Sequence, residues 1–187
     1  MITYNFCFDE NKISLLRSLV HKRMDHYRSD PFDFNNAVFE NVSLFIGDNI
    51  FQITAPLVVL NYYGAMEEIS ILNFDSCSLD DVGSSLMNVE QIDVLINDEI
   101  QAISIVNEIQ RAFRDDVMFQ ELKQTRGVIF KFKGHELSFE KEREFSQDIY
   151  INRGNNLLDK FLPVDWFSEG WRANEKGICT REIITLQ

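Results

Sequence analysis

Carboxylates are the residues of this chain whose types and spacing are best suited to chemistry. General acid–base or metal-assisted hydrolysis needs two or three carboxylates that converge in a cleft. Glu136, Glu140 and Glu142 alternate with other residues, so a strand would carry all three on one face. This pattern is compatible with a carboxylate-based, metal-dependent hydrolase, and its plain alternative is a strand face exposed to solvent.

Other chemistries lack their sequence signatures. Phosphate-binding loops need closely spaced glycines, whereas the eight glycines here are scattered and form neither GxGxxG nor GxxxxGK[ST]. His21 and His26 are five residues apart, which separates them by about 140° on a helix. The sequence has no GxSxG motif, and nothing in it pairs a cysteine with a histidine. We therefore expect no metal, no cofactor and no catalytic residue, which favours a non-enzymatic protein.

The chain is strongly acidic, with a formal net charge of −12 at pH 7. Most of the excess lies in residues 65–121, where thirteen carboxylates and only two arginines leave a local charge of −11. Residues 10–28, by contrast, hold five Lys or Arg and only two carboxylates. A negative field repels phosphate backbones, so we expect no nucleic-acid partner.

A basic protein is the partner that this charge fits best. Complementary charge speeds association and disfavours wrong partners. In size and charge the chain is similar to small acidic inhibitor or immunity-type proteins, although no motif accompanies this likeness. We therefore predict a protein-binding module that captures a basic protein; the alternative is an acidic surface that only maintains solubility. The predicted binding residues in the acidic segment are Asp80, Asp81, Glu90, Asp93, Asp98 and Glu99.

An aromatic group near the C-terminus supplies a second candidate contact. Trp166 and Trp171 lie in the sequence KFLPVDWFSEGW, together with Phe161 and Phe167. Indoles are favoured interface anchors because they bury a large area and keep a polar N–H. We therefore add both tryptophans to the predicted binding residues. Two alternatives stay open, namely a structural or oligomeric accessory subunit that uses these rings, and rings that simply plug one end of a core.

The remaining composition predicts a soluble, cytoplasmic protein with no membrane partner. Cys7, Cys77 and Cys179 are odd in number and form no CxxC pair, which is typical of reduced thiols. Residues 1–9 have neither the basic start nor the apolar run of a secretory signal. The apolar stretch at 57–63 is far shorter than the ~20 residues that a membrane-spanning helix needs.

The elements that would position these residues are mainly strands. Alternating apolar residues predict strands in the first half at 2–8, 42–46, 51–55, 57–63 (buried), 68–74 and 92–96. Gly47-Asp48-Asn49 suits a tight turn between two of them. Helical spacing predicts a first helix that begins after Asp9 or Asn11 and ends near Arg28. Residues 75–88, rich in Ser, Asp and Gly, are the best candidate loop.

The second half is less regular. Residues 99–113 fit either a strand that returns through Asn97-Asp98 or a helix. Their isoleucines favour a strand up to Val106, and we predict a helix from there to Gln124. Further strands are predicted at 128–132, 137–139, 149–151 and 180–186, and short helices after Asn155 or Asn156 and at Pro163. The sequence thus predicts a single α+β domain, residues 1–187, of mostly antiparallel sheet with an N-terminal helix and one to three shorter helices in the C-terminal half.

Overall fold

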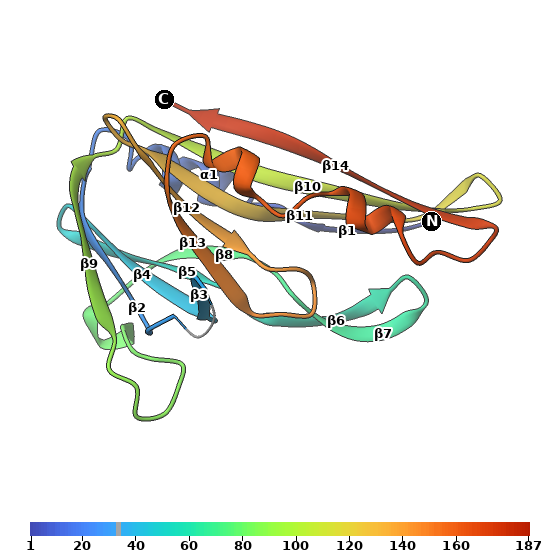
Figure 1. The fold of residues 1–187 in the computed structure, drawn as a ribbon, viewed down its shortest axis with the longest axis horizontal. Helices are drawn as coiled ribbons and strands as arrows, with labels where there is room; N and C mark the ends of the chain where they lie inside the picture. The colour runs from blue at the N-terminus through green and yellow to red at the C-terminus, as the bar shows by residue number, and fades with distance from the viewer. Residues whose placement is uncertain (33–34) are drawn as a thin grey trace.

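The computed structural model describes residues 1–32 and 35–187 and is built mainly of antiparallel strands, as the hairpin-rich sequence predicts. Two sheets face each other across an apolar core at the left-hand end of Figure 1. The longest strands continue beyond this core to the right-hand end, where other elements cover them. The two ends of these long strands therefore have different surroundings, and the candidate site lies at the right-hand end.

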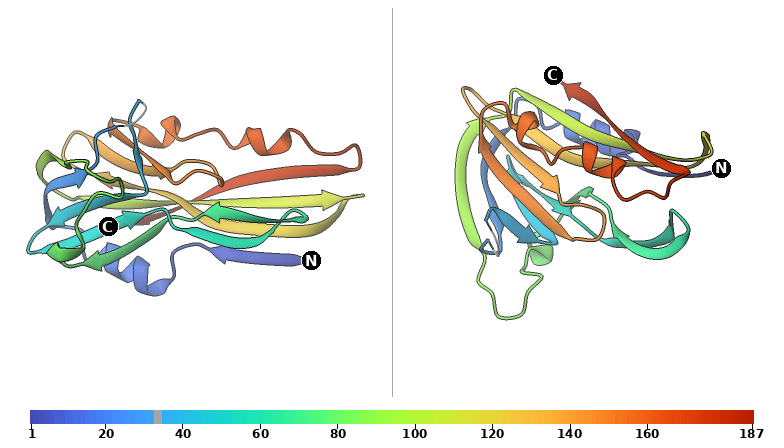
Figure 2. Two further views of the ribbon diagram at one scale, coloured as in Figure 1. Left: turned by 90° about the horizontal axis from the view of Figure 1, so that it is seen from below. Right: turned by 45° about the vertical axis from the view of Figure 1, so that its right-hand side comes forward.

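The first sheet has seven strands, in the order β14-β10-β11-β12-β13-β3, with β1 paired to β11. Its strands are β1 (Ile2–Phe6), β3 (Ala37–Phe39), β10 (Ala102–Arg114), β11 (Val117–Lys131), β12 (Glu136–Lys141), β13 (Asp148–Gly154) and β14 (Glu175–Leu186). All neighbours are antiparallel except β1, which runs parallel to β11. Figure 2 shows β10, β11 and β14 running along the molecule, with α1 and β1 on one side and the C-terminal turns on the other.

The second sheet has five strands, in the order β8-β5-β4-β2-β9. Its strands are β2 (Arg23–Ser29), β4 (Asn41–Ile46), β5 (Asn49–Thr54), β8 (Asn73–Cys77) and β9 (Ile92–Glu99). Between β5 and β8 the chain leaves this sheet and forms a separate hairpin of β6 (Leu57–Tyr62) and β7 (Ala65–Ser70). The predicted turn at Gly47-Asp48 joins β4 to β5, and Gly47 has the positive φ of 58° that favours glycine there.

The core between the sheets is apolar. Ile103 and Phe130 from the first sheet meet Leu44 and Ile53 from the second, and all four are buried. Leu16 of α1 (Glu10–Arg17) is also fully buried in this core. Burial of apolar surface at about 25 cal/mol per Å² therefore stabilises this end of the molecule.

The N-terminal helix is shorter than predicted. The Asp9 carboxylate accepts a hydrogen bond from the Lys12 backbone N–H at 2.9 Å and caps α1. The helix ends at Arg17, not near Arg28, because residues 23–29 form β2. Strand β2 lies between β4 and β9, and a bulge after Met24 shifts its register. Pairing on both edges thus overrides a spacing that also suited a helix.

The predicted helix from Val106 to Gln124 is likewise replaced by strands. Strand β10 continues to Arg114, and Asp115-Asp116 joins it to β11 in a two-residue turn. Both aspartates have positive φ, 49° and 62°, as such a turn requires. The strand does not return through Asn97-Asp98, because β9 runs through these residues and pairs with β2.

Three further predictions differ from the structure. Of the predicted buried strand at 57–63, residues 57–62 form β6, but only Leu60 in it is buried, and Tyr63 belongs to the turn. The predicted strand at 68–74 is divided between β7 and β8. The helices of the C-terminal half are short 3₁₀ turns, η2 (Leu157–Lys160) and η3 (Asp165–Ser168), and a third turn, η1 (Leu79–Asp81), lies in the predicted loop. Within the part of the chain that the structure describes, no helix is long and apolar enough to cross a membrane.

A β-bulge divides the two long strands. Val106 of β10 pairs with Gly127, but the next residue, Asn107, pairs with Thr125, so Arg126 is an extra residue opposite no partner. Before the bulge the strands carry Ile103, Ile105 and Phe130 into the apolar core. Beyond it their buried residues are mostly polar, namely Asn107, Glu108, Gln110, Gln120, Gln124, Thr125 and Arg126.

Candidate functional site

The β6–β7 hairpin contributes two neighbouring tyrosines to the candidate site. Its loop is the two residues Tyr63 and Gly64, both with positive φ, 50° and 106°. A bulky side chain rarely adopts this conformation, and Asn-Gly is the preferred sequence for such a turn. Gln120 holds the strained residue by accepting from the Tyr63 N–H at 3.1 Å and donating to Asn61 O at 2.8 Å. The turn therefore keeps an aromatic ring at a position where Asn would be less strained.

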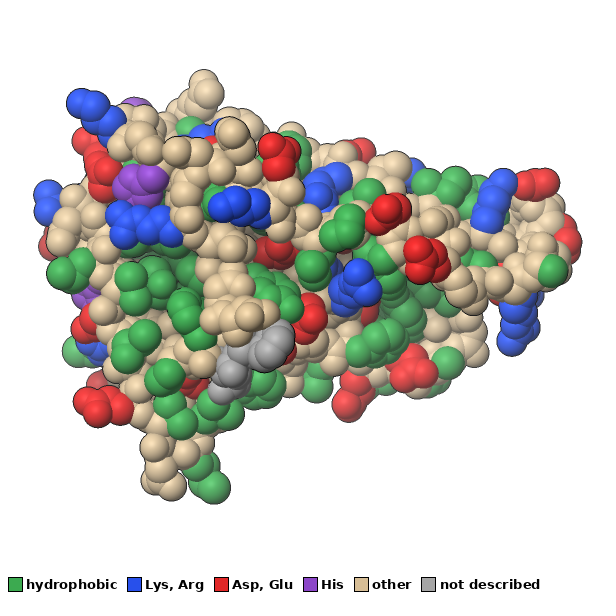
Figure 3. Space-filling model, in the orientation of Figure 1, with side chains coloured by type: hydrophobic (Ala, Val, Ile, Leu, Met, Phe, Trp, Pro, Cys, Tyr) green, Lys and Arg blue, Asp and Glu red, His purple; other side chains and the backbone are tan. Residues whose placement is uncertain are grey.

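Six aromatic side chains and a short loop enclose a pocket of about 260 Å³ beside this hairpin. The pocket is lined by Tyr62, Tyr63, Phe145, Trp166, Phe167, Glu169, Gly170 and Trp171. Tyr63, Phe167 and Trp171 pack with ring centroids 5.3–5.4 Å apart and strongly tilted planes. Figure 3 shows hydrophobic side chains on this right-hand half of the molecule as well as on the left-hand half, and those on the right have both acidic and basic side chains beside them.

Two of the pocket's aromatic walls differ in how tightly they are packed. Gly177 of β14 lies beneath Trp171, and an added Cβ would stand 2.2 Å from the indole nitrogen and 2.3 Å from Phe167 O. The Trp171 indole N–H donates to that same carbonyl at 2.6 Å. Phe145, on the loop after β12, stays 63% exposed and contacts the Tyr62 ring edge-on at a centroid distance of 5.3 Å.

A buried hydrogen-bond network fixes the inner side of the pocket. The hydroxyls of Tyr62 and Tyr63 both donate to Gln110 Oε1, at 3.4 and 3.3 Å. Gln110 Nε2 in turn donates to the Glu144 carboxylate, which also accepts from Gln124 Nε2 at 2.8 Å. Burial and the negative charge of Glu144 raise the pKa of both tyrosines. The phenols are therefore neutral donors at physiological pH, and the rings are held by their hydroxyl ends.

A cluster of buried charges lies next to this network. Arg126, Glu108 and Glu140 are at most 2% exposed, with Arg126 Nε 3.5 Å from Glu140 Oε1 and 4.0 Å from Glu108 Oε2. Arg181 donates to Glu108 Oε1 at 2.6 Å. Desolvation lowers the pKa of the buried Lys141 to about 7. Paired charges of both signs thus replace apolar packing beneath this half of the sheet.

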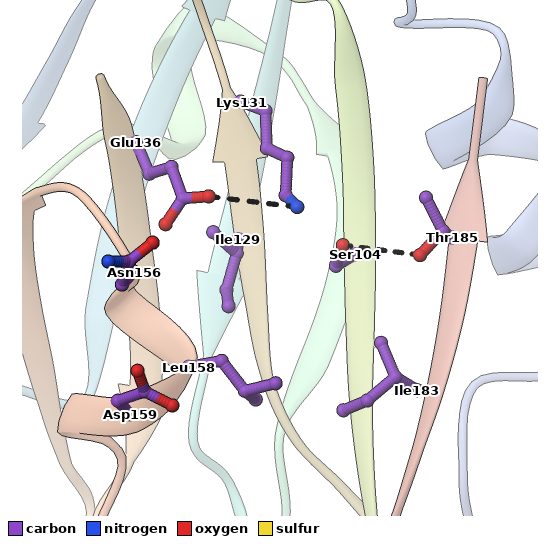
Figure 4. Close-up of a pocket in the computed structure, with 9 residues that line it drawn as sticks. All are labelled: Ser104, Ile129, Lys131, Glu136, Asn156, Leu158, Asp159, Ile183 and Thr185. Carbon is purple, nitrogen blue, oxygen red and sulfur yellow. Dashed lines mark hydrogen bonds and ion pairs between the residues drawn. The ribbon is translucent and has the colours of Figure 1, made fainter. Parts of the chain in front are cut away.

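A second pocket, of about 280 Å³, lies between η2 and β14 on the first sheet (Figure 4). Four of its polar side chains already form two pairs. Lys131 lies 3.6 Å from Glu136, and the hydroxyls of Ser104 and Thr185 are 3.5 Å apart. Glu136 also accepts from the Leu157 N–H at 2.8 Å. We regard the aromatic pocket as the stronger candidate, because it brings six aromatic rings together around only one charged side chain, Glu169.

The predicted acidic residues lie at the end of the molecule opposite to the aromatic pocket, in or near η1 and β9. Several of them have intramolecular partners. Asp93 binds Arg28 through two hydrogen bonds of 2.6 and 2.9 Å. Asp98 and Glu99 lie 3.9 and 3.3 Å from the rings of His135 and His21. Asp81 accepts from the Ser78 hydroxyl and N–H.

Asp80 and Glu90 are exposed and form no ion pair with any described residue. The basic segment seen in the sequence is not segregated from the acidic one, because β2, which carries Arg23 and Arg28, pairs directly with β9. The structure therefore does not bring the six predicted acids and the two tryptophans into one site.

The three carboxylates proposed for hydrolysis have separate structural partners. Glu136 pairs with Lys131, Glu140 with Arg126, and Glu142 accepts from the Tyr150 hydroxyl at 3.2 Å. Within residues 1–32 and 35–187, no group of three or more His, Cys, Asp or Glu is placed to hold a metal ion.

The structure does bring Trp166 and Trp171 into one pocket. Sequence reasoning missed Tyr62, Tyr63 and Phe145 as their companions. A signal for the tyrosines was present, since a tight turn at Gly64 preceded by two bulky rings departs from ordinary turn chemistry. Phe145, surrounded by charged and polar residues, gave no periodic signal.

No known protein family, curated protein or solved structure matches this chain.

Proposed function

We propose that this protein is a non-enzymatic binding module that captures a basic protein partner, with the aromatic pocket as its anchor site. The observation that carries the proposal is a pocket lined by six aromatic rings on a chain of net charge −12. Partly exposed aromatic rings are the commonest anchors of protein interfaces. Negative charge would add speed and selectivity for a basic partner.

The strained turn supports this proposal. A non-glycine residue in the left-handed region costs of order 1 kcal/mol, and Asn in place of Tyr63 would remove most of that cost. Retaining Tyr63 there keeps a ring that contacts Phe167 and Trp171. Strain of this kind is concentrated at binding and catalytic sites.

The acidic residues around η1 and β9 have a different role in this proposal. They lie away from the pocket and several are paired internally, so they would steer a basic partner over a distance and not anchor it. Substituting them is expected to slow association and weaken its salt dependence, whereas substituting pocket rings is expected to speed dissociation.

The test uses a fluorescently labelled peptide of about 20 residues, rich in Arg and Leu, and measures association and dissociation rates. Phe145→Ser is expected to raise the dissociation rate several-fold. Its matched control is Leu95→Ser, because Leu95 on β9 is similarly exposed, at 65% against 63%, but lies at the other end of the molecule. Neutralising Asp80, Asp81, Asp93 and Asp98 together to the amides should reduce the association rate at low salt.

Equal dissociation rates for Phe145→Ser and Leu95→Ser would contradict the pocket as anchor. Equal binding of the basic peptide and an acidic peptide of the same length would contradict a basic partner. Circular dichroism spectra of each variant confirm that its fold is retained.

A further inference from the structure

Arg143 already uses one ring of the aromatic pocket. Its guanidinium carbon lies 4.6 Å from the centroid of the Trp166 ring, within the range of a cation–π contact. Arg143 is exposed and belongs to the same loop as Phe145. The loop thus places an arginine from this chain against Trp166, one of the rings that line the pocket.

Charge at the pocket favours a cation as occupant. Glu169 is the one charged residue among the described residues that line it. Asp165, at the start of η3, and Glu67 and Glu68, on β7, are also exposed. The hydroxyls of Tyr62 and Tyr63 donate inward to Gln110, so these two residues line the pocket as neutral aromatic rings.

From these observations we infer that the aromatic pocket takes up an arginine side chain of the basic partner, and that Arg143 is an internal competitor for it. The inference rests on the function proposed above and names the group that the pocket recognises. Arginine fits better than lysine because its planar guanidinium stacks on aromatic rings and is less strongly hydrated. The pocket volume of about 260 Å³ is sufficient for one such side chain.

Intrinsic fluorescence can report on this pocket alone. The chain contains two tryptophans, and both line the pocket. We would titrate the protein with N-acetyl-arginine amide, N-acetyl-lysine amide and N-acetyl-norleucine amide, which share a backbone and differ in charge and planarity. A saturable change in emission with the arginine probe, tighter than with the other two, is the expected result.

Three variants separate a π contact from simple apolar packing. Phe145→Leu keeps an apolar side chain but removes a ring face, and should weaken the arginine probe about two- to five-fold while leaving norleucine unchanged. Arg143→Ala removes the competitor and should tighten the arginine probe by a similar factor. Leu95→Ser, remote from the pocket, should change neither.

Each other outcome overturns the inference in a distinct way. If norleucine binds as tightly as arginine, the anchor is apolar, and the proposed binding function stands without the arginine. If Arg143→Ala does not tighten the arginine probe, Arg143 is not a competitor. If no probe alters tryptophan emission but Phe145→Ser still releases the basic peptide faster, the pocket binds another group; if both fail, the proposed function fails as well.

Discussion

The two ends of β10 and β11 are built on opposite principles. On one side of the bulge at Arg126, Ile103, Ile105 and Phe130 pack in an apolar core between two sheets. On the other side the same strands bury Glu108, Gln110 and Gln124 beneath an aromatic pocket. Apolar packing is tolerant of geometry, whereas buried polar groups must be paired precisely. The polar end therefore depends on specific partners, such as Gln110 for the two tyrosine hydroxyls and Glu144 for Gln110 and Gln124.

The largest expected effect is on the free energy of unfolding, and it shows whether the polar end is stabilised by its buried ion pairs. Arg126→Met leaves Glu140 without its ion-pair partner and Glu108 with Arg181 alone, and should lower the free energy of unfolding by about 3–5 kcal/mol. Phe130→Ala, in the apolar core, should cost a similar ~3–5 kcal/mol. Adding Glu140→Gln should recover part of the loss in Arg126→Met but none in Phe130→Ala, as measured by urea unfolding. If the effects of Glu140→Gln and of the first substitution simply add in both double variants, Arg126 and Glu140 are not energetically coupled.

The next largest effect concerns the pH dependence of Lys141. Its pKa is about 7 in the folded state, against 10.5 for a free lysine side chain, so the unfolded chain binds more protons between these values. Stability should therefore rise with pH by up to about 2–3 kcal/mol between pH 7 and 9. Lys141→Met should remove this rise. The measurement stops at pH 9 because the half-buried Cys7 and Cys179, with raised pKa values of about 11 and 12, act in the opposite direction above it.

Gly177→Ala tests whether the pocket is assembled by close contact with β14. The new Cβ would overlap Trp171 and Phe167 O, so the indole must move, at a cost of about 1–3 kcal/mol. Tryptophan emission should shift towards red as the ring becomes exposed. Gly83→Ala is the matched control, because nothing lies within 4 Å of its Cβ position. An unchanged emission spectrum in Gly177→Ala would show that the close contact between Gly177 and Trp171 does not hold the indole in place.

The smallest effect contrasts a surface ion pair with the buried one. Arg28 binds Asp93 at 2.6 Å, which is shorter than the 3.5 Å between Arg126 and Glu140. Asp93 is nevertheless exposed, so solvent screens the pair, and Arg28→Ala should cost only about 0.2–1 kcal/mol. A loss as large as that in Arg126→Met would contradict the importance of burial. Chemical denaturation of both variants under one set of conditions makes the comparison direct.

Individual elements show how far sequence patterns reached. The β4–β5 hairpin was predictable because Val42, Leu44 and Ile46 alternate before a glycine turn. The continuation of β10 after Val106 was not predictable, because this isoleucine-rich segment fits both the helical and the strand period. Pairing with β11 and β14 makes it a strand. The Asp115-Asp116 turn carried the one local signal against a helix there.

For the candidate site, the sequence by itself determined that the chain is acidic and that two tryptophans lie close together near its C-terminus. Only the tertiary structure decided that Tyr62, Tyr63 and Phe145 join them, and that basic β2 lies beside acidic β9. Patterns of local spacing report only on residues that are close together in the sequence. These residues meet instead through strand pairing and a buried glutamine network that joins segments more than 40 residues apart.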